Sequence, residues 1–175
     1  ITNRSAPRLL WRINETTPGY SELGYSHSTP ALTKFGPAGG APVAIVGAGY
    51  DFHFDAESVD TPNPSGHGRG LYAIDLHTGE RLGFAQAAGM TFAIPSDPLI
   101  FDINGDGQFD RGYIGDLGGN LWRIRDDFQV DRLFATPSGQ RIFYPPDAVV
   151  NSGSVMVYFG TGDRSNPLST EVTDR

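Results

Sequence analysis

The chain has 175 residues, enough for one domain with a hydrophobic core, and its 23 glycines and 13 prolines favour short strands joined by turns. The formal net charge is −7, with 13 basic and 20 acidic residues and Lys34 as the single lysine, which argues against nucleic acid and against a polybasic membrane patch. The absence of cysteine excludes disulfides and thiolate chemistry, and no apolar run approaches the roughly 20 residues of a membrane span.

Short apolar runs bounded by Gly, Pro, Asn or Asp recur along the chain and predict strands, because no segment keeps helical periodicity over three turns. The predicted strands span residues 8–13, 29–35, 42–50, 70–76, 80–86, 97–103, 111–117, 120–126, 131–136, 140–144, 147–151 and 154–162. The chain opens in the style of a strand and stops without an obvious cap, which we interpret as a segment of a longer protein. The expected fold class is all-β.

The predicted strands also repeat. The run "STPALTKF…APVAIVGAGY…GLYAIDLHTGERL" has the same order of features as "SDPLIFDI…RGYIGDLGGNLWRIRDDFQVDRL", and Trp11, Tyr72 and Trp122 fall at equivalent places. Four strands repeating at roughly 40–50 residues are typical of propeller blades. Residues 1–175 are therefore expected to form a partial β-propeller of three to four blades with an insert at 51–69, and the other blades would belong to the same or an associated chain. A β-sandwich with chance similarity is the alternative.

The stretch "FDINGDGQFDRGYIGDLGGNLWRI" carries an unusual density of side-chain oxygens. If Asp102 is position 1, ligands follow at positions 3, 5, 7 and 9, with the seventh offered by a backbone carbonyl, as in calcium-binding loops. Gly107 stands at position 6, where the chain must turn sharply. The predicted metal ligands are Asp102, Asn104, Asp106, Gln108 and Asp110, and the predicted ion is Ca²⁺.

The loop departs from an EF-hand at position 12, where Tyr113 replaces the bidentate glutamate and the flanks are strands. Fewer anionic ligands predict a modest affinity, about micromolar or weaker. The alternative is a hairpin turn rich in Asn and Asp, since Asn-Gly and Asp-Gly are common turn pairs.

The insert also holds acidic residues and a histidine, which could bind a metal. They lack a glycine turn and a fixed register, so a solvated loop is the favoured interpretation. These residues are Asp51, His53, Asp55, Glu57 and Asp60.

The stretch "GDLGGNLWRI" predicts a tight hairpin, because Asp116 and Asn120 bracket two glycines. Trp122 is expected to pack between blades rather than bind a ligand. Catalysis finds no support: the four histidines are scattered, no G-x-S-x-G occurs, and "GAGY" lacks the helix of a dinucleotide site. No catalytic residue is predicted, and the protein is expected not to be an enzyme.

Two resemblances follow from these motifs. "GLYAIDLHTGERLG" resembles the blade repeat of quinoprotein propellers, with Ala73, Asp75, Thr78 and Gly79 in place but Gly83 where that repeat has Trp. Over about residues 8–163 the chain more closely resembles the C-terminal propeller of the PilY1/PilC family of type IV pilus tip proteins. The Asp/Asn loop followed by "YIGDLGGNLWRI" is the most specific part of that resemblance.

The PilY1/PilC resemblance implies a calcium site at Asp102, Asn104, Asp106, Gln108 and Asp110. It also implies a secreted or cell-surface protein, at the pilus tip or outer membrane, that acts in pilus biogenesis, adhesion and twitching motility. Calcium occupancy would regulate pilus extension and retraction, and the partners would be pilins, a host or abiotic surface, and the rest of the propeller. The alternatives are a PQQ-type dehydrogenase fragment and a purely structural scaffold propeller.

Overall fold

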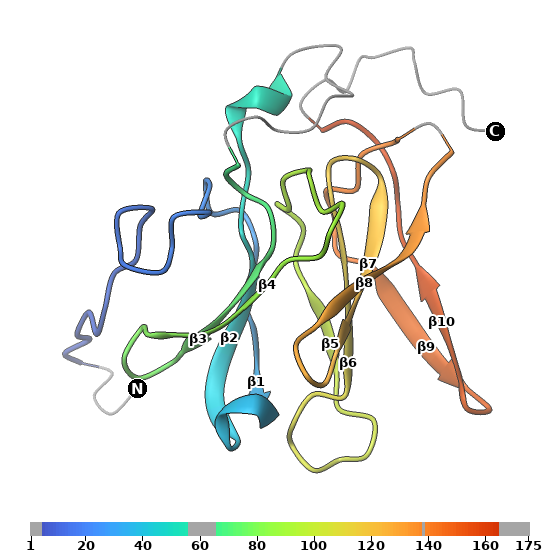
Figure 1. The fold of residues 1–175 in the computed structure, drawn as a ribbon. Helices are drawn as coiled ribbons and strands as arrows, with labels where there is room; N and C mark the ends of the chain where they lie inside the picture. Colours follow the sequence, from blue (N-terminus) through green and yellow to red (C-terminus); the bar gives the residue numbers. More distant parts are fainter. Residues whose placement is uncertain (1–4, 56–65, 138, 165–175) are drawn as a thin grey trace.

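The computed structural model describes residues 5–55, 66–137 and 139–164, which form three antiparallel sheets standing side by side (Figure 1). The first sheet contains β1 (Ala31–Phe35), β2 (Ala41–Gly47), β3 (Leu71–Asp75) and β4 (Arg81–Ala85). The second contains β5 (Leu99–Phe101), β6 (Arg111–Gly115), β7 (Asn120–Arg125) and β8 (Val130–Ala135). The third is the hairpin of β9 (Asp147–Asn151) and β10 (Ser154–Tyr158).

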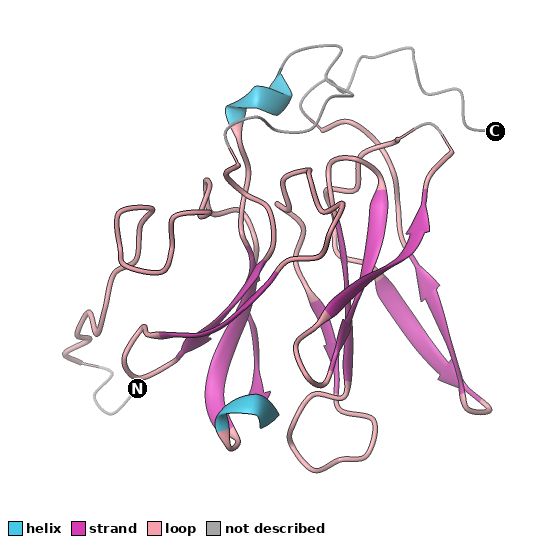
Figure 2. Ribbon diagram, in the orientation of Figure 1, coloured by secondary structure: helices cyan, strands magenta, loops and turns pink. Residues whose placement is uncertain are grey.

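The described residues contain no α-helix, only the short 3₁₀ turns η1 (Gly36–Ala38) and η2 (Phe52–Asp55), so the all-β prediction is confirmed (Figure 2). Within each four-stranded sheet the strands pair in sequence order, each antiparallel to the next. The three sheets are separate in the described part of the chain, and none of them closes on itself. No helix among the described residues is long and apolar enough to cross a membrane.

The two four-stranded sheets use equivalent residues in equivalent places. Tyr72 pairs with Val46 on the neighbouring strand, as Trp122 pairs with Ile114. Because side chains alternate between the faces of a strand, the residue before each of these aromatic residues, Leu71 or Leu121, points to the opposite face. The repeat seen in the sequence is therefore a repeat of strand order and register.

The main core lies between the first and second sheets. Leu71 from β3 and Trp122 and Ile124 from β7 are buried in the same cluster, which confirms that Trp122 packs between sheets. Tyr72, on the other face of β3, packs against Tyr20 and the N-terminal segment. Leu121, on the other face of β7, packs toward the β9–β10 hairpin. Both sheets thus bury both of their faces.

Gly83 explains one departure from the quinoprotein repeat. A Cβ atom at Gly83 would lie 2.9 Å from Cδ1 of Phe128 and 3.0 Å from Cζ of Phe35. The position that holds Trp in that repeat therefore faces two aromatic rings in the core between the sheets, and a bulky side chain has no room there.

Two predicted strands are wrong. Residues 8–13 pair with no strand, because the segment crosses the face of the first sheet rather than its edge: Trp11 packs on Gly79 and donates from Nε1 to the carbonyl of Leu76 at 3.1 Å. Residues 140–144 also form no strand. Ile142 N–H donates to the backbone carbonyl of Asp116 and the Arg141 carbonyl accepts from Gly162 N–H, so neighbouring backbone groups bond to different segments and no ladder forms.

The other ten predicted strands are confirmed, although those of 42–50, 97–103 and 154–162 end earlier than expected. Of the insert at 51–69, residues 56–65 lie outside the described part of the chain, so Glu57 and Asp60 are not placed. The described beginning of the insert is not simply solvated, since Phe54 in η2 is fully buried beside Phe92.

Candidate metal-binding loop

The predicted calcium loop connects β5 to β6 at the end of the molecule where η1 also lies (Figure 1). Its base is closed by a hydrogen bond of 2.8 Å from Asp110 N–H to the Phe101 carbonyl. The loop tip is exposed, whereas Phe109 beside the base is buried. The five predicted ligands therefore stand on one surface loop that a buried aromatic residue anchors.

Two carboxylates hold the loop from its ends. Asp102 accepts from Gly105 N–H at 2.6 Å and from Gly107 N–H at 2.7 Å. Asp110 accepts from the backbone N–H groups of Ile103 and Asn104, at 2.6 and 3.1 Å. These backbone hydrogen bonds fix the orientation of both carboxylates within the loop.

The middle of the loop is built from successive Asx turns. Asn104 Oδ1 accepts from Asp106 N–H and Asp106 Oδ1 accepts from Gln108 N–H, both at 2.8 Å. Gly105 and Gly107 have φ of 79° and 84°, left-handed conformations that favour glycine. Asp102, Asn104 and Asp106 thus turn their side-chain oxygens toward the loop backbone, while the glycines allow the chain to reverse.

The loop also contacts the first sheet. Gln108 forms an isolated parallel bridge with Lys34 of β1, and the ring of Phe109 stacks against Phe35 with centroids 6.3 Å apart. Phe109 also meets Phe128 edge to face at 6.4 Å. The base of the loop is therefore part of the contact between the two sheets.

A hollow of about 440 Å³ opens beside the loop and is shared with the β7–β8 turn. Asp126 and Asp127 add two carboxylates to its lining, and neither was predicted as a site residue. The acidic pair is visible in the sequence as "IRDDF", but only the fold places it beside the loop. The lining residues are Gly36, Pro37, Asn104, Asp106, Gln108, Phe109, Asp110, Asp126 and Asp127.

The donor set fits a hard cation because it is made of carboxylate, amide and carbonyl oxygens, the ligands Ca²⁺ prefers. Asn104 and Asp110 are joined by a 3.3 Å hydrogen bond from Nδ2 to Oδ1, whereas the side chain of Asp106 bonds to Gln108 N–H. In the described parts of the chain, no three His, Cys, Asp or Glu side chains converge as a metal-binding group. Binding an ion would require the loop carboxylates Asp102, Asp106 and Asp110 to converge more closely than they do here.

The described acidic residues of the insert, Asp51 and Asp55, make local hydrogen bonds around η2. Asp51 accepts from His53 N–H at 2.8 Å, and Asp55 accepts from the hydroxyl of Tyr50. These contacts stabilise the turn at η2 and bring Asp55 to a different part of the molecule from the loop 102–110.

The predicted hairpin at Asp116 is confirmed and centres on a buried carboxylate. Asp116 accepts from Gly118 and Asn120 N–H at 2.9 Å, from the Asn120 amide, and from Nε1 of Trp122 at 2.7 Å. Burial raises the pKa of the Asp116 carboxyl, while these N–H donors act in the opposite direction. This buried cluster fixes the turn between β6 and β7, which is a structural role.

Comparisons with known proteins agree with the family resemblance of the sequence. No family model matches this chain. It is 32% identical over 128 residues to the type IV pilus biogenesis factor PilY1 of Pseudomonas aeruginosa PAO1, and 30% identical over 127 residues to that of strain UCBPP-PA14. Each match covers 71% of this chain and 10% of the relative. The chain therefore spans about a tenth of the length of these relatives.

Among solved structures, the crystal structure of the Pseudomonas aeruginosa PilY1 C-terminal domain is similar to this fold, with a TM-score of 0.70 and 24% sequence identity. The match covers 91% of this chain and 36% of that domain. The fold similarity thus includes nearly all of this chain, but only about a third of the solved domain.

Proposed function

This chain belongs to the family of the PilY1 C-terminal domain, and we propose that it acts in type IV pilus biogenesis as a calcium-binding segment of a β-propeller. It works at the cell surface or pilus tip, and its partners are pilus components and the surface to which the cell attaches. It has no catalytic role.

The stacking of the sheets supports the propeller assignment. The first and second sheets pack face to face, with Leu71 of β3 and Trp122 of β7 in one buried cluster, and their first strands, β1 and β5, lie beside each other. The β9–β10 hairpin occupies the next place in the same series. Repeated sheets with adjacent first strands and buried faces are the arrangement of propeller blades.

The loop at 102–110 carries the proposed calcium function. Its oxygens recur at alternate residues, its two glycines have the conformation that the turn needs, and it is anchored by Phe109 between two sheets. When bound, Ca²⁺ supplies a positive charge that offsets the repulsion among Asp102, Asp106 and Asp110. The loop residues then hold one conformation on the exposed end of the molecule.

Regulation of the pilus would follow because calcium binding fixes the conformation of the loop at 102–110. Without the ion, three carboxylates within one nine-residue loop repel each other, and hydrogen bonds from the loop backbone and from the Asn104 amide offset part of that repulsion. With the ion, the loop and the adjoining acidic turn at Asp126 and Asp127 present a fixed surface to a pilus component. Calcium occupancy thereby regulates pilus extension, retraction and attachment.

Isothermal titration calorimetry with Ca²⁺ tests the binding step. Wild type is expected to bind one Ca²⁺ with an affinity of about micromolar or weaker, and Asp106→Ala to lose at least about tenfold. Asp106→Asn keeps the acceptor for Gln108 N–H but removes the charge, so its loss should be smaller. Asp147→Ala is the matched control, because Asp147 is an exposed carboxylate at the start of β9.

Equal heats for wild type and Asp106→Ala would refute the calcium site. Calcium binding with unaltered pilus retraction and attachment in cells that carry Asp106→Ala would instead leave a structural ion and refute the regulatory function.

A further inference from the structure

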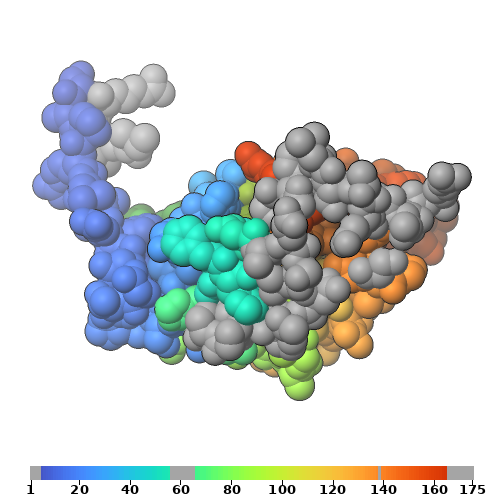
Figure 3. All heavy atoms as spheres, turned by 90° about the horizontal axis from the view of Figure 1, so that it is seen from above, coloured from blue at the N-terminus to red at the C-terminus, as the bar shows by residue number. Residues whose placement is uncertain are grey.

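A pocket of about 470 Å³ lies at the opposite end of the molecule from the calcium loop, a volume typical of small-ligand sites. Figure 3 looks onto this end, where the teal atoms of η2 lie. The segments leading into β1, β5 and β9 all contribute to it, at 27–29, 95–97 and 143–145. The pocket is therefore built jointly by the segments that lead into the three sheets.

Aromatic rings form part of the pocket lining. Tyr50 is buried, with its ring centroid 5.7 Å from His27 and 6.3 Å from Phe143. Tyr144 follows Phe143 and is 58% exposed, so its ring is open to solvent. Faces of aromatic rings carry a negative partial charge and attract cations within about 6 Å.

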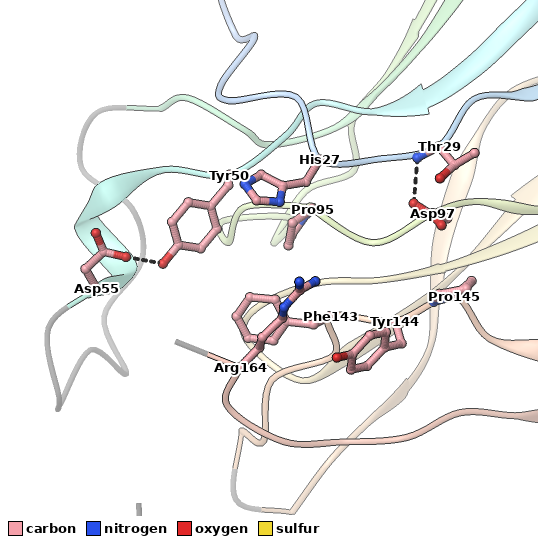
Figure 4. Close-up of a pocket in the computed structure, with 10 residues that line it drawn as sticks. All are labelled: His27, Thr29, Tyr50, Asp55, Pro95, Asp97, Phe143, Tyr144, Pro145 and Arg164. Carbon is pink, nitrogen blue, oxygen red and sulfur yellow. Dashed lines mark hydrogen bonds between the residues drawn. The ribbon is translucent and has the colours of Figure 1, made fainter. Parts of the chain in front are cut away.

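Two carboxylates add negative charge. Asp97 accepts from Thr29 N–H at 2.6 Å, and Asp55 accepts from the Tyr50 hydroxyl (Figure 4). These bonds hold each carboxylate in place and leave lone pairs on it, since a carboxylate can accept about four hydrogen bonds. The pocket thus has two oriented anions beside three aromatic side chains.

The chain itself already places a cation here. The Cζ atom of Arg164, which follows β10, lies 5.8 Å from the ring centroid of Tyr144, and Figure 4 shows its guanidinium pointing into the pocket. Arg164 is itself exposed to solvent. A guanidinium group is therefore compatible with the size and charge of the pocket.

We propose that this pocket binds the guanidinium or ammonium group of an arginine or lysine side chain from a partner protein, and that Arg164 is an internal occupant which the partner displaces. The carboxylates of Asp55 and Asp97 supply the charge, and the rings of Phe143 and Tyr144 supply the faces. The overall charge of −7 favours approach of a basic partner segment. This site is independent of calcium.

Titration with N-acetylargininamide, followed by ¹H–¹⁵N NMR on the whole chain, tests the proposal. The shifts should concentrate at 27–29, 95–97 and 143–145, and the neutral isostere N-acetylcitrullinamide should bind at least fivefold more weakly. Arg164→Gln should strengthen binding of the arginine probe severalfold, because it removes the internal competitor. N-acetyllysinamide tests whether an ammonium group suffices.

Two isosteric variants identify the charges. Asp55→Asn and Asp97→Asn each keep a carbonyl oxygen to accept the existing hydrogen bond, so the fold should hold while affinity falls about two- to fivefold, the effect expected of one exposed ion pair. Glu80→Gln removes an exposed carboxylate elsewhere and should leave binding unchanged.

Equal binding of the arginine and citrulline probes would overturn the proposal. So would weaker binding in Arg164→Gln. Binding of acetate to wild type that is lost in Arg164→Gln would show that the pocket takes an anion through Arg164 and would likewise refute a cation site.

Discussion

Replacing Asp116 with alanine should destabilise the chain more than any exposed carboxylate substitution. Asp116 has no solvent exposure, and its two oxygens together serve the backbone and amide of Asn120 and the indole of Trp122. Alanine removes both oxygens and leaves these buried donors without an acceptor. Asp116 also fixes the β6–β7 turn, so its replacement weakens the pairing of the two central strands of the second sheet.

The magnitude follows from those donors. Each buried donor left unsatisfied costs about 1–3 kcal/mol, while removing a buried carboxylate recovers part of its own burial cost. The backbone N–H and amide of Asn120 and the indole N–H of Trp122 lose their acceptor, so a net loss of about 3–5 kcal/mol in the free energy of unfolding is expected. For a chain of this size that corresponds to a fall in Tm of roughly 6–20 °C.

Urea denaturation followed by tryptophan fluorescence measures this loss, because Trp122 is buried beside the substitution. Asp131→Ala is the control. Asp131 pairs with Arg123 at 2.8 Å in a half-exposed salt bridge, so its removal should cost no more than about 1 kcal/mol. Trp122→Phe should cost less in the Asp116→Ala background than in wild type, since one shared hydrogen bond is already lost.

A loss below about 1 kcal/mol for Asp116→Ala would refute the reasoning. It would mean that water or a shifted side chain satisfies the donors of Asn120 and Trp122.

Two further predictions concern the same fold. Gly115→Ala would place a Cβ atom 2.1 Å from Cγ2 of Ile142, so it should cost about 1–3 kcal/mol in urea denaturation, and less in an Ile142→Ala background; equal costs in both would contradict the clash. Hydrogen bonds from Thr78 and His77 N–H lower the pKa of Asp75 below 3.8, so its stabilisation is present above that pH and is lost as pH falls through the lowered pKa. Wild type should therefore melt above Asp75→Asn at about pH 6 and converge with it in acid, whereas a constant difference would exclude this linkage.

The sequence was sufficient for most strands because the alternation of apolar residues and the Gly, Asn and Asp turns are local signals. It also predicted the hairpin at Asp116 and Asn120, since both turn residues and glycines are adjacent in the chain. It failed at 8–13 and 140–144, which are apolar enough for strands. An apolar pattern indicates that side chains pack against the core. Trp11 and Ile142 do so without pairing to a neighbouring strand.

The calcium loop could be proposed from sequence because all five ligand positions lie within nine residues and their spacing is fixed by the chain. The sequence could not show that Asp126 and Asp127 lie beside this loop, because the β7–β8 turn comes next to it only when the second sheet forms. The contact of Gln108 with Lys34 is likewise a contact between two sheets.

By itself, the sequence of this protein determined its all-β class, its repeat and the oxygen register of residues 102–110, since each depends on residues close together in the chain. Only the tertiary structure decided which faces pack and what the packing brings together. His27, Asp97 and Tyr144 come from the segments that lead into β1, β5 and β9 of three different sheets, and they meet in one pocket because these segments lie at the same end of the molecule. No local pattern encodes that meeting, which depends on how the sheets stack.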